Sequence, residues 1–343
     1  MTGAQAGYTA GVRRSDPSKP GITRRRQGRG WRFLDPTGRP LSPEETERVR
    51  SLAIPPAWRD VWICPHPTGH IQAVGTDDAG RRQYLYHEQW RKQRDEAKHE
   101  RVQELAVILP RFRAAVHDDL SSDGLTCRRV LGGALRMLDR GVFRTGGEEY
   151  AEENGSHGVA TLLREHVVLR RGLLVFDYPA KSGLQRAVSL NDPELSALVR
   201  SLKRVRTGSD RLLAYRERRG QWRELRSGEI NDRFKELTAA DYTVKDLRTW
   251  HATVVAAIGF ARAEAATSQR ARKRVDAAVM DMVADDLGNT RAIARKSYVD
   301  ARVVEAFAEG RTIRATLDRT GDDLTDEATR QRIERAVLKL LDS

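Results

Sequence analysis

The feature that most constrains the fold is a change of pattern near Tyr86. Between Trp31 and Tyr86, short apolar segments alternate with turn sequences such as DPTG, HPTG and DDAG, which is typical of a small antiparallel sheet. The stretch that follows, EQWRKQRDEAKHERVQELAVILPRFRAAVHDDL, has apolar residues at helical spacing and a charged opposite face. The chain of 343 residues is long enough for two domains of roughly 100–200 residues each, so the pattern predicts two domains of different class.

Composition divides the chain into three parts. Residues 1–30 are rich in Gly, Ser, Pro and Arg and show no apolar period, so we predict a flexible basic tail. Residues 31–93 form the predicted β-rich domain, which contains one helix starting at the N-cap candidate Ser42, with Glu45 three residues later. Residues 94–343 form the larger, mainly helical domain.

The larger domain is predicted to carry one short antiparallel sheet among its helices. The β-rich segments GVATLL, HVVLRRG, LLVFDY and QRAVSL lie between His157 and Leu190, and PAKSG forms the turn of the last hairpin. The fold class is therefore α+β. The predicted helices are Cys127–Arg140, Ile230–Leu237, Val244–Ala265, Gln269–Leu287, Ala294–Ala308 and Asp326–Leu341.

Charge narrows the class of partner. The formal net charge of +13 favours a polyanion, with nucleic acid ahead of an anionic membrane. The longest apolar stretch, Thr253–Ala261, is well short of the roughly 20 residues that span a bilayer, and residues 1–30 have no apolar core typical of a signal peptide. Cys64 and Cys127 form no CxxC pair, which suits a reducing cytoplasm and indicates neither a zinc ribbon nor a disulfide framework.

Four segments contain candidate functional side chains. Arg144 precedes a Gly-Gly pair that would let a ligand approach closely, and Lys181 is predicted at a hairpin tip. Lys245 and Arg248 share one face at the start of a helix, where the helix dipole does not favour positive charge. Tyr298 follows two basic residues. Taken singly, each has an ordinary interpretation as a surface, turn, capping or core residue.

In combination these segments resemble the type IB DNA topoisomerases, specifically the short poxvirus and bacterial branch, over nearly the whole chain. The resemblance rests on FRTGGEEY, FDYPAKSG, KDLRTW and KSYVD, in that order. It implies that Tyr298 is the nucleophile, that Arg144 and Arg248 are catalytic arginines and that Lys181 is the catalytic lysine. GRRQYLY at Gly80–Tyr86 resembles a DNA-contacting segment of the family. The residues expected to bind DNA are Gln83, Tyr84, Tyr86, Tyr150 and Lys245.

The chain departs from the family pattern at two places. Asn289 stands nine residues before the nucleophile, where the family usually has histidine. An amide can still donate a neutral hydrogen bond to a non-bridging phosphate oxygen, so we expect Asn289 to keep the catalytic role. Gly147, Glu148 and Glu149 stand where viral relatives have lysines, so a preferred cleavage sequence cannot be carried over.

The resemblance implies relaxation of supercoiled DNA through a transient single-strand break and a 3′-phosphotyrosyl link that stores the bond energy. No nucleotide cofactor is expected, and the sequence has no Walker loop. No metal is expected either, because His66 and His70 lie in a turn and paired acidic residues are typical of solvated faces. The expected partner is double-stranded DNA, and no membrane is expected as a partner. The protein is expected to be a monomer that clamps around the DNA and to be cytoplasmic and associated with the nucleoid.

Two alternatives remain open from the sequence. A tyrosine recombinase uses a similar arginine pair, lysine hairpin and tyrosine, but usually has histidine at the position of Lys245 and directly after the arginine, where Thr249 stands. A non-catalytic architectural DNA-binding protein would explain the charge. It would leave the ordered set of Arg144, Lys181, Arg248 and Tyr298 unexplained.

Overall fold

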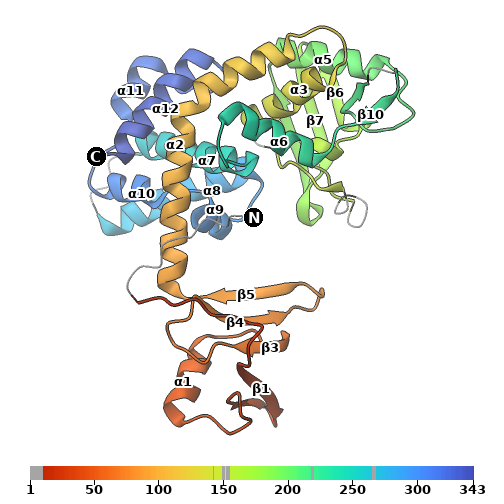
Figure 1. Cartoon of the computed structure of the whole chain (residues 1–343). Coiled ribbons are helices and arrows are strands. Elements are labelled where there is room, and N and C mark those ends of the chain that lie inside the picture. The colour runs from red at the N-terminus through yellow and green to blue at the C-terminus, as the bar shows by residue number, and fades with distance from the viewer. Residues whose placement is uncertain (1–10, 142, 149–150, 152–154, 218–219, 265–267) are drawn as a thin grey trace. The chain divides into compact units, whose positions relative to one another are not determined.

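Contacts divide the chain into a unit of residues 1–98 and a unit of residues 99–343, and both are drawn in Figure 1. The dividing point lies within α2, a helix that runs from Glu88 to Leu120. The boundary predicted between residues 93 and 94 lies in the same helix. The computed structural model describes residues 11–141, 143–148, 151, 155–217, 220–264 and 268–343.

The N-terminal unit is built on a five-stranded antiparallel sheet with the strand order β2-β1-β3-β4-β5. Its strands are β1 (Ile22–Gln27), β2 (Gly30–Leu34), β3 (Arg59–Ile63), β4 (Ile71–Thr76) and β5 (Arg82–Tyr86). Helix α1 (Pro43–Ser51) begins with the predicted capping box, in which Glu45 N–H donates to Ser42 Oγ at 3.2 Å. The predicted sheet and its capped helix are both confirmed.

Strand β1 corrects the prediction of a flexible tail. Ile22 is buried in the apolar core beneath the sheet. Arg24 donates to the carbonyl of Pro55 at 2.8 Å, and its guanidinium lies 4.2 Å from the centre of the Trp31 ring. The contacts of Arg24 thus hold a strand whose sequence shows no apolar period. Residues 1–10 of the predicted tail lie outside the described residues.

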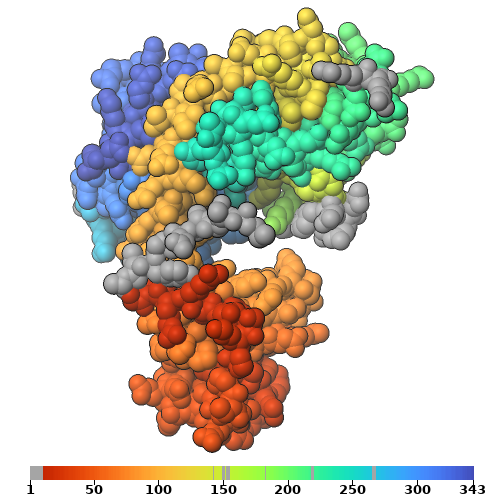
Figure 2. Space-filling view, in the orientation of Figure 1, coloured from red at the N-terminus to blue at the C-terminus, as the bar shows by residue number. Residues whose placement is uncertain are grey.

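Helices dominate the C-terminal unit, as the sequence predicts. After α2, the helices named among the described residues are α3 (Cys127–Arg140), α5 (Pro193–Arg204), α6 (Ser227–Thr238), α7 (Val244–Arg262), α8 (Gln269–Leu287), α9 (Arg291–Ser297), α10 (Ala301–Ala308), α11 (Arg314–Thr320) and α12 (Glu327–Leu341). Helix α7 is largely buried and packs against α3, α6, α8, α10, α11 and α12, whereas α6 lies at the surface (Figure 2). Helices α5 and α11 form where none was predicted. None of the described helices is long and apolar enough to cross a bilayer.

The sheet of this unit has three antiparallel strands in the order β6-β7-β8. They are β6 (Val167–Arg170), β7 (Leu173–Pro179) and β8 (Gln185–Leu190). The last hairpin turns through Lys181–Gly183, as predicted. The prediction of a strand at GVATLL is wrong, because Val159–Thr161 forms a 3₁₀ turn. Its side chains are buried as a strand's would be, and burial alone does not distinguish the two structures.

Candidate active site

Two arginines from separate elements meet at the C-terminal end of α8. Arg248 on α7 donates through Nη2 to the carbonyl of Leu287 at 2.8 Å. Arg144, which follows α3, donates through Nη2 to the carbonyl of Gly288 at 3.1 Å and to Asn289 Oδ1. The last carbonyls of a helix lack partners within it and form the negative end of its dipole. The end of α8 therefore gathers two guanidinium groups at one place.

The loop that carries Arg144 is fixed through its backbone. The N–H groups of Val159 and Ala160 donate to the carbonyls of Arg144 at 2.9 Å and Thr145 at 2.8 Å. A Cβ at Gly158 would lie 2.6 Å from the Arg144 carbonyl oxygen, closer than such atoms can approach. The 3₁₀ turn where a strand was predicted thus holds the first arginine in position.

The second arginine is almost fully buried. The Arg248 side chain lies on a helix whose neighbouring residues form the core, and the residue is only 4% exposed. Burial lowers the pKa of its guanidinium to about 10, although Tyr298 acts in the opposite direction. The group therefore stays charged at neutral pH, and burial strengthens its attraction for an anion.

Tyr298 lies beside the Arg248 guanidinium. The arginine carbon is 5.5 Å from the centre of the half-buried phenol ring. Burial would raise the pKa of the phenol, but the charge of Arg248, its hydrogen bond to Tyr298 and the charges of Lys245 and Arg144 outweigh burial and lower that pKa. The surroundings thus favour the phenolate, which is the nucleophilic form.

A break between two helices sets the place of Tyr298. The predicted helix Ala294–Ala308 is wrong in its continuity, because α9 ends at Ser297 and α10 begins at Ala301. Thr253 Oγ1 on α7 accepts the N–H of Asp300 at 3.2 Å, and its single proton is shared between the carbonyls of Thr249, at 3.1 Å, and Tyr298, at 3.4 Å. The Thr253 hydroxyl therefore holds the backbone on both sides of the break.

Asn289 directs its amide so that one donor stays available. Its Oδ1 accepts from Arg144, and its backbone N–H donates to the carbonyl of Ala284 at 2.9 Å. Its Nδ2 is buried and has no hydrogen-bond partner in the described part of the chain. Because a buried donor without a partner costs about 1–3 kcal/mol, this orientation suits a ligand that supplies an oxygen.

Lys181 is not brought into contact with these four residues. It is exposed at the tip of the β7–β8 hairpin. Among the described residues its ammonium group has no hydrogen bond or ion pair. The position of Lys181 therefore depends on how the hairpin itself is held.

Arg186 is a candidate site residue that the sequence analysis did not identify. It lies on β8, opposite Tyr178 in the register of the hairpin. Its Nη2 donates to the carbonyl of Asp286 at 2.6 Å, again at the end of α8. A Cβ at Gly288 would lie 2.6 Å from Arg186 Nη1, so the approach depends on glycine. The strand register would have shown Arg186 beside Tyr178, but not its contact with a helix a hundred residues away.

The residues expected to bind DNA lie in several places. Tyr84 and Tyr86 are exposed on one face of β5, with ring centres 6.0 Å apart and ring planes nearly parallel. Gln83 directly precedes Tyr84 in the strand and therefore lies on its opposite face, and its Nε2 donates to Asp77 at 2.9 Å. Lys245 is exposed on α7. Tyr150 lies outside the described residues.

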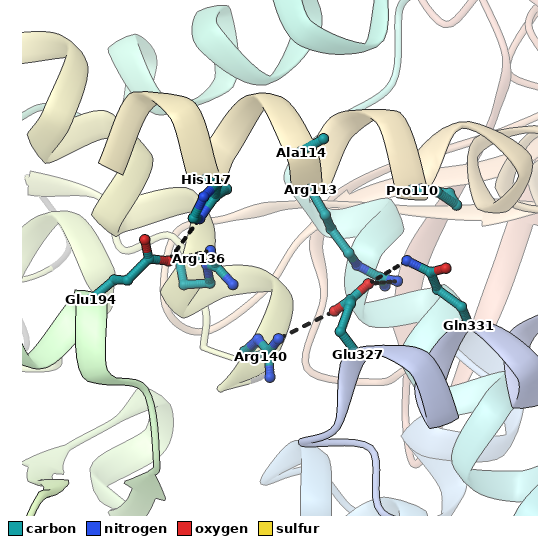
Figure 3. Close-up of a pocket in the computed structure, with 9 residues that line it drawn as sticks. All are labelled: Pro110, Arg113, Ala114, His117, Arg136, Arg140, Glu194, Glu327 and Gln331. Atoms are coloured by element: carbon teal, nitrogen blue, oxygen red, sulfur yellow. Dashed lines mark hydrogen bonds and ion pairs between the residues drawn. The ribbon is translucent and has the colours of Figure 1, made fainter. Parts of the chain in front are cut away.

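A second polar cluster in the C-terminal unit contains none of the expected site residues. Arg113 donates to both oxygens of Glu334 at 2.7 Å, and Arg330 donates to Asp139 at 2.7 Å. Trp250 Nε1 on α7 also donates to Glu334, at 3.2 Å. Figure 3 shows the adjoining pocket, in which Arg140 and Glu327 point toward each other. The pocket is lined by Pro110, Arg113, Ala114, His117, Arg136, Arg140, Glu194, Glu327 and Gln331.

Comparison with known proteins decides the family. Residues 87–323 match the catalytic core of eukaryotic DNA topoisomerase I, and residues 30–77 match the N-terminal domain of bacterial DNA topoisomerase IB. The chain belongs to the type IB DNA topoisomerases. DNA topoisomerase 1B of Acanthamoeba polyphaga mimivirus is 27% identical over 274 residues, which cover 78% of this chain and 81% of that protein. The resemblance found in the sequence is confirmed, and the topoisomerase acts on DNA.

Among the described residues, no group of three or more His, Cys, Asp or Glu side chains is placed to hold a metal ion. The candidate site consists of two buried or half-buried arginines, one phenol and one amide at the end of α8. This is an arrangement suited to an anion with several oxygens.

Proposed function

We propose that this topoisomerase relaxes supercoiled DNA without ATP or a metal ion, by breaking and rejoining one strand through Tyr298. The observation that carries the proposal is the convergence of Arg144, Arg248 and Asn289 on one helix end beside the Tyr298 phenol. A phosphodiester resists attack because its anionic oxygens repel the nucleophile and its alkoxide is a poor leaving group. The fixed positive charge of the two arginines reduces the repulsion between the phosphate oxygens and the nucleophile.

Arg144 and Arg248 bind the non-bridging oxygens of the scissile phosphate in this proposal. Both guanidinium groups are already oriented by carbonyls of α8, so little reorganisation is needed as negative charge builds up in the transition state. The unpartnered Nδ2 of Asn289 donates to one of the same oxygens. It supplies a neutral hydrogen bond where the family usually has histidine.

Tyr298 attacks phosphorus while the bond from phosphorus to the 5′ oxygen breaks. The phenol proton passes to solvent, and the lowered pKa of Tyr298 makes this loss easier. Lys181 donates a proton to the departing 5′ oxygen. The products are a 3′-phosphotyrosyl link and a free 5′ hydroxyl, and the reverse attack by that hydroxyl rejoins the strand. The bond energy is conserved, so no ATP is required.

The exposed Tyr84 and Tyr86 pair and the exposed Lys245 bind the duplex in this proposal. Arg82 lies 5.8 Å from the Tyr84 ring, which adds positive charge to an aromatic surface. We propose that Gln83 and Tyr150 also contact DNA, that the topoisomerase closes around the duplex as a monomer, and that it works in the cytoplasm on the nucleoid.

The proposal is tested by relaxation of plasmid DNA in EDTA without ATP. Both positive and negative supercoils should be relaxed. Tyr298→Phe should bind duplex DNA as tightly as the wild type yet form no covalent adduct. Trapping the adduct on a nicked duplex and mapping the modified residue should identify Tyr298 on a 3′ phosphate. An adduct at another residue, or a 5′ linkage, would contradict the mechanism.

A further inference from the structure

The β7–β8 hairpin carries Lys181 at its tip and Arg186 five residues later. The turn between the strands is short and closed, since Ala180 N–H donates to the carbonyl of Leu184 at 2.8 Å. The last strand pair before the turn joins Pro179 to Gln185. The place of Lys181 is therefore set by wherever the top of this hairpin is held.

Arg186 holds the hairpin to the end of α8. Its guanidinium donates to the carbonyl of Asp286 and hydrogen-bonds the phenol of Tyr178 across the strands. A single planar group thus joins β7, β8 and the helix end, which a guanidinium can do because its donors are fixed in direction. Gly288, with a φ of 60°, leaves the space that Arg186 occupies.

The end of α8, which Arg186 contacts, is the same helix end that orients Arg144 and Arg248. The three arginines donate to three consecutive carbonyls. Arg186 donates to Asp286, Arg248 to Leu287 and Arg144 to Gly288. The end of α8 therefore contacts both the hairpin and the two arginines that are proposed to bind phosphate. Lys181 has no such contact of its own.

We propose that Arg186 is a positioning residue, which anchors the hairpin to α8 so that Lys181 meets the 5′ oxygen of the phosphate bound by the two arginines. The inference rests on the proposed role of Lys181 as the proton donor. Arg186 acts through Lys181 and does not touch the reacting atoms. Its loss should therefore affect the step in which the leaving group is protonated more than the other steps.

The test compares single-turnover cleavage of two duplexes that differ at one atom. In the second duplex, sulfur replaces the 5′ bridging oxygen. A thiol has a pKa near 8.5, so its thiolate leaves without a proton donor. On the oxygen duplex, Arg186→Ala should cleave about 10²-fold more slowly than the wild type, which is within the range for loss of general-acid catalysis. On the sulfur duplex its rate should approach the wild-type rate.

Lys181→Ala on the same two duplexes separates the two proposals. Slow cleavage of both duplexes by Lys181→Ala would refute its role as proton donor. If sulfur restores the cleavage rate of Lys181→Ala but not that of Arg186→Ala, the role of Lys181 as proton donor is supported. The anchoring role of Arg186 is then contradicted. An unchanged rate for Arg186→Ala on the oxygen duplex would also overturn the inference. The double variant should be no slower than Lys181→Ala alone.

Three further variants serve as controls. Arg170→Ala removes a positive charge from the exposed end of β6 in the same sheet and should leave both rates unchanged. Arg186→Lys can reach one of the two partners and should restore part of the oxygen rate. If Arg186→Ala does not fold, Arg186→Lys and Tyr178→Phe, which each remove part of the anchor, should show the same selective loss on the oxygen duplex. Equal losses on both duplexes would contradict anchoring.

Discussion

The C-terminal unit contains two clusters of buried or half-buried arginines whose hydrogen-bond acceptors differ in charge. Arg113 and Arg330 are held by carboxylates, Asp139 and Glu334. Arg144 and Arg248 donate instead to carbonyls and to an amide, which carry no net charge. The first cluster has its charge compensated within the protein. In the second cluster, the groups that accept these hydrogen bonds add no negative charge.

The pKa values of Arg113 and Arg248 are shifted in opposite directions, which agrees with this difference in acceptors. Burial would lower the pKa of Arg113, but the charges and hydrogen bonds of Asp139 and Glu334 raise it well above its ordinary value. Burial lowers the pKa of Arg248 to about 10, because no comparable compensation outweighs the loss of water. We therefore propose that a buried arginine is structural in the first cluster and binds phosphate in the second. Changes in the first should cost stability, and changes in the second should cost rate.

The largest expected effect is on stability. Glu334→Ala leaves two guanidinium groups without their shared carboxylate and Trp250 without an acceptor, so the free energy of unfolding should fall by about 3–5 kcal/mol. Urea unfolding followed by fluorescence measures the loss. Glu327→Ala, at the more exposed edge of the same cluster, serves as the control and should cost less than about 1 kcal/mol. Equal costs for the two variants would argue against a buried structural cluster.

The next effect is on rate. Arg248→Gln removes a fixed charge from the phosphate but retains a donor, so single-turnover cleavage should slow by about 10²–10³-fold. The free energy of unfolding should stay nearly unchanged or rise, because a desolvated charge is removed. A large loss of stability in this variant would mean that the two clusters do not differ in the way described.

Asn289 should have a smaller effect, since its amide is neutral. Asn289→Ala removes one hydrogen bond to an anionic oxygen, worth about 1.5–3 kcal/mol, and should slow cleavage by roughly 10-fold or more. Asn289→His should retain cleavage, because the imidazole can donate to the same oxygen. Single-turnover assays on one duplex compare the two. Cleavage by the alanine variant at the wild-type rate would remove Asn289 from the site.

Much of the fold was readable from the sequence because helices and strands carry their own periods. The limits of α3 and α8 were predicted to the residue, and so was the capping box of α1. Strand β1 was not, because the contacts of Arg24 replace an apolar period. The break after α9 was also missed. The backbone at this break contacts the hydroxyl of Thr253, which lies 45 residues before Tyr298 in the chain.

The family resemblance named the candidate site residues, but the physical reason for their grouping was not in any motif. The sequence showed that Arg248 needs some partner at the start of α7. It could not show that the partner is a carbonyl of α8, or that Arg186 binds the same helix end. Contacts between distant segments depend on packing, and local patterns do not record packing. The roles of the site residues stay predictions.

The smallest expected effect is a shift in pH dependence. The pKa of Tyr298 is lowered because positive charge, chiefly that of Arg248, outweighs the effect of burial. Since the phenolate is the nucleophile, the cleavage rate should rise with pH and level off below the ordinary phenol pKa of about 10. Arg248→Gln removes the main cause of the lowered pKa, so its slower reaction should level off at a higher pH. Single-turnover pH profiles measure both. Lys339→Ala removes an exposed charge on α12 and should leave the profile unchanged. If Arg248→Gln levels off at the same pH as the wild type, the charge held at the end of α8 does not activate the nucleophile, and the contrast between the two arginine clusters would extend only to phosphate binding.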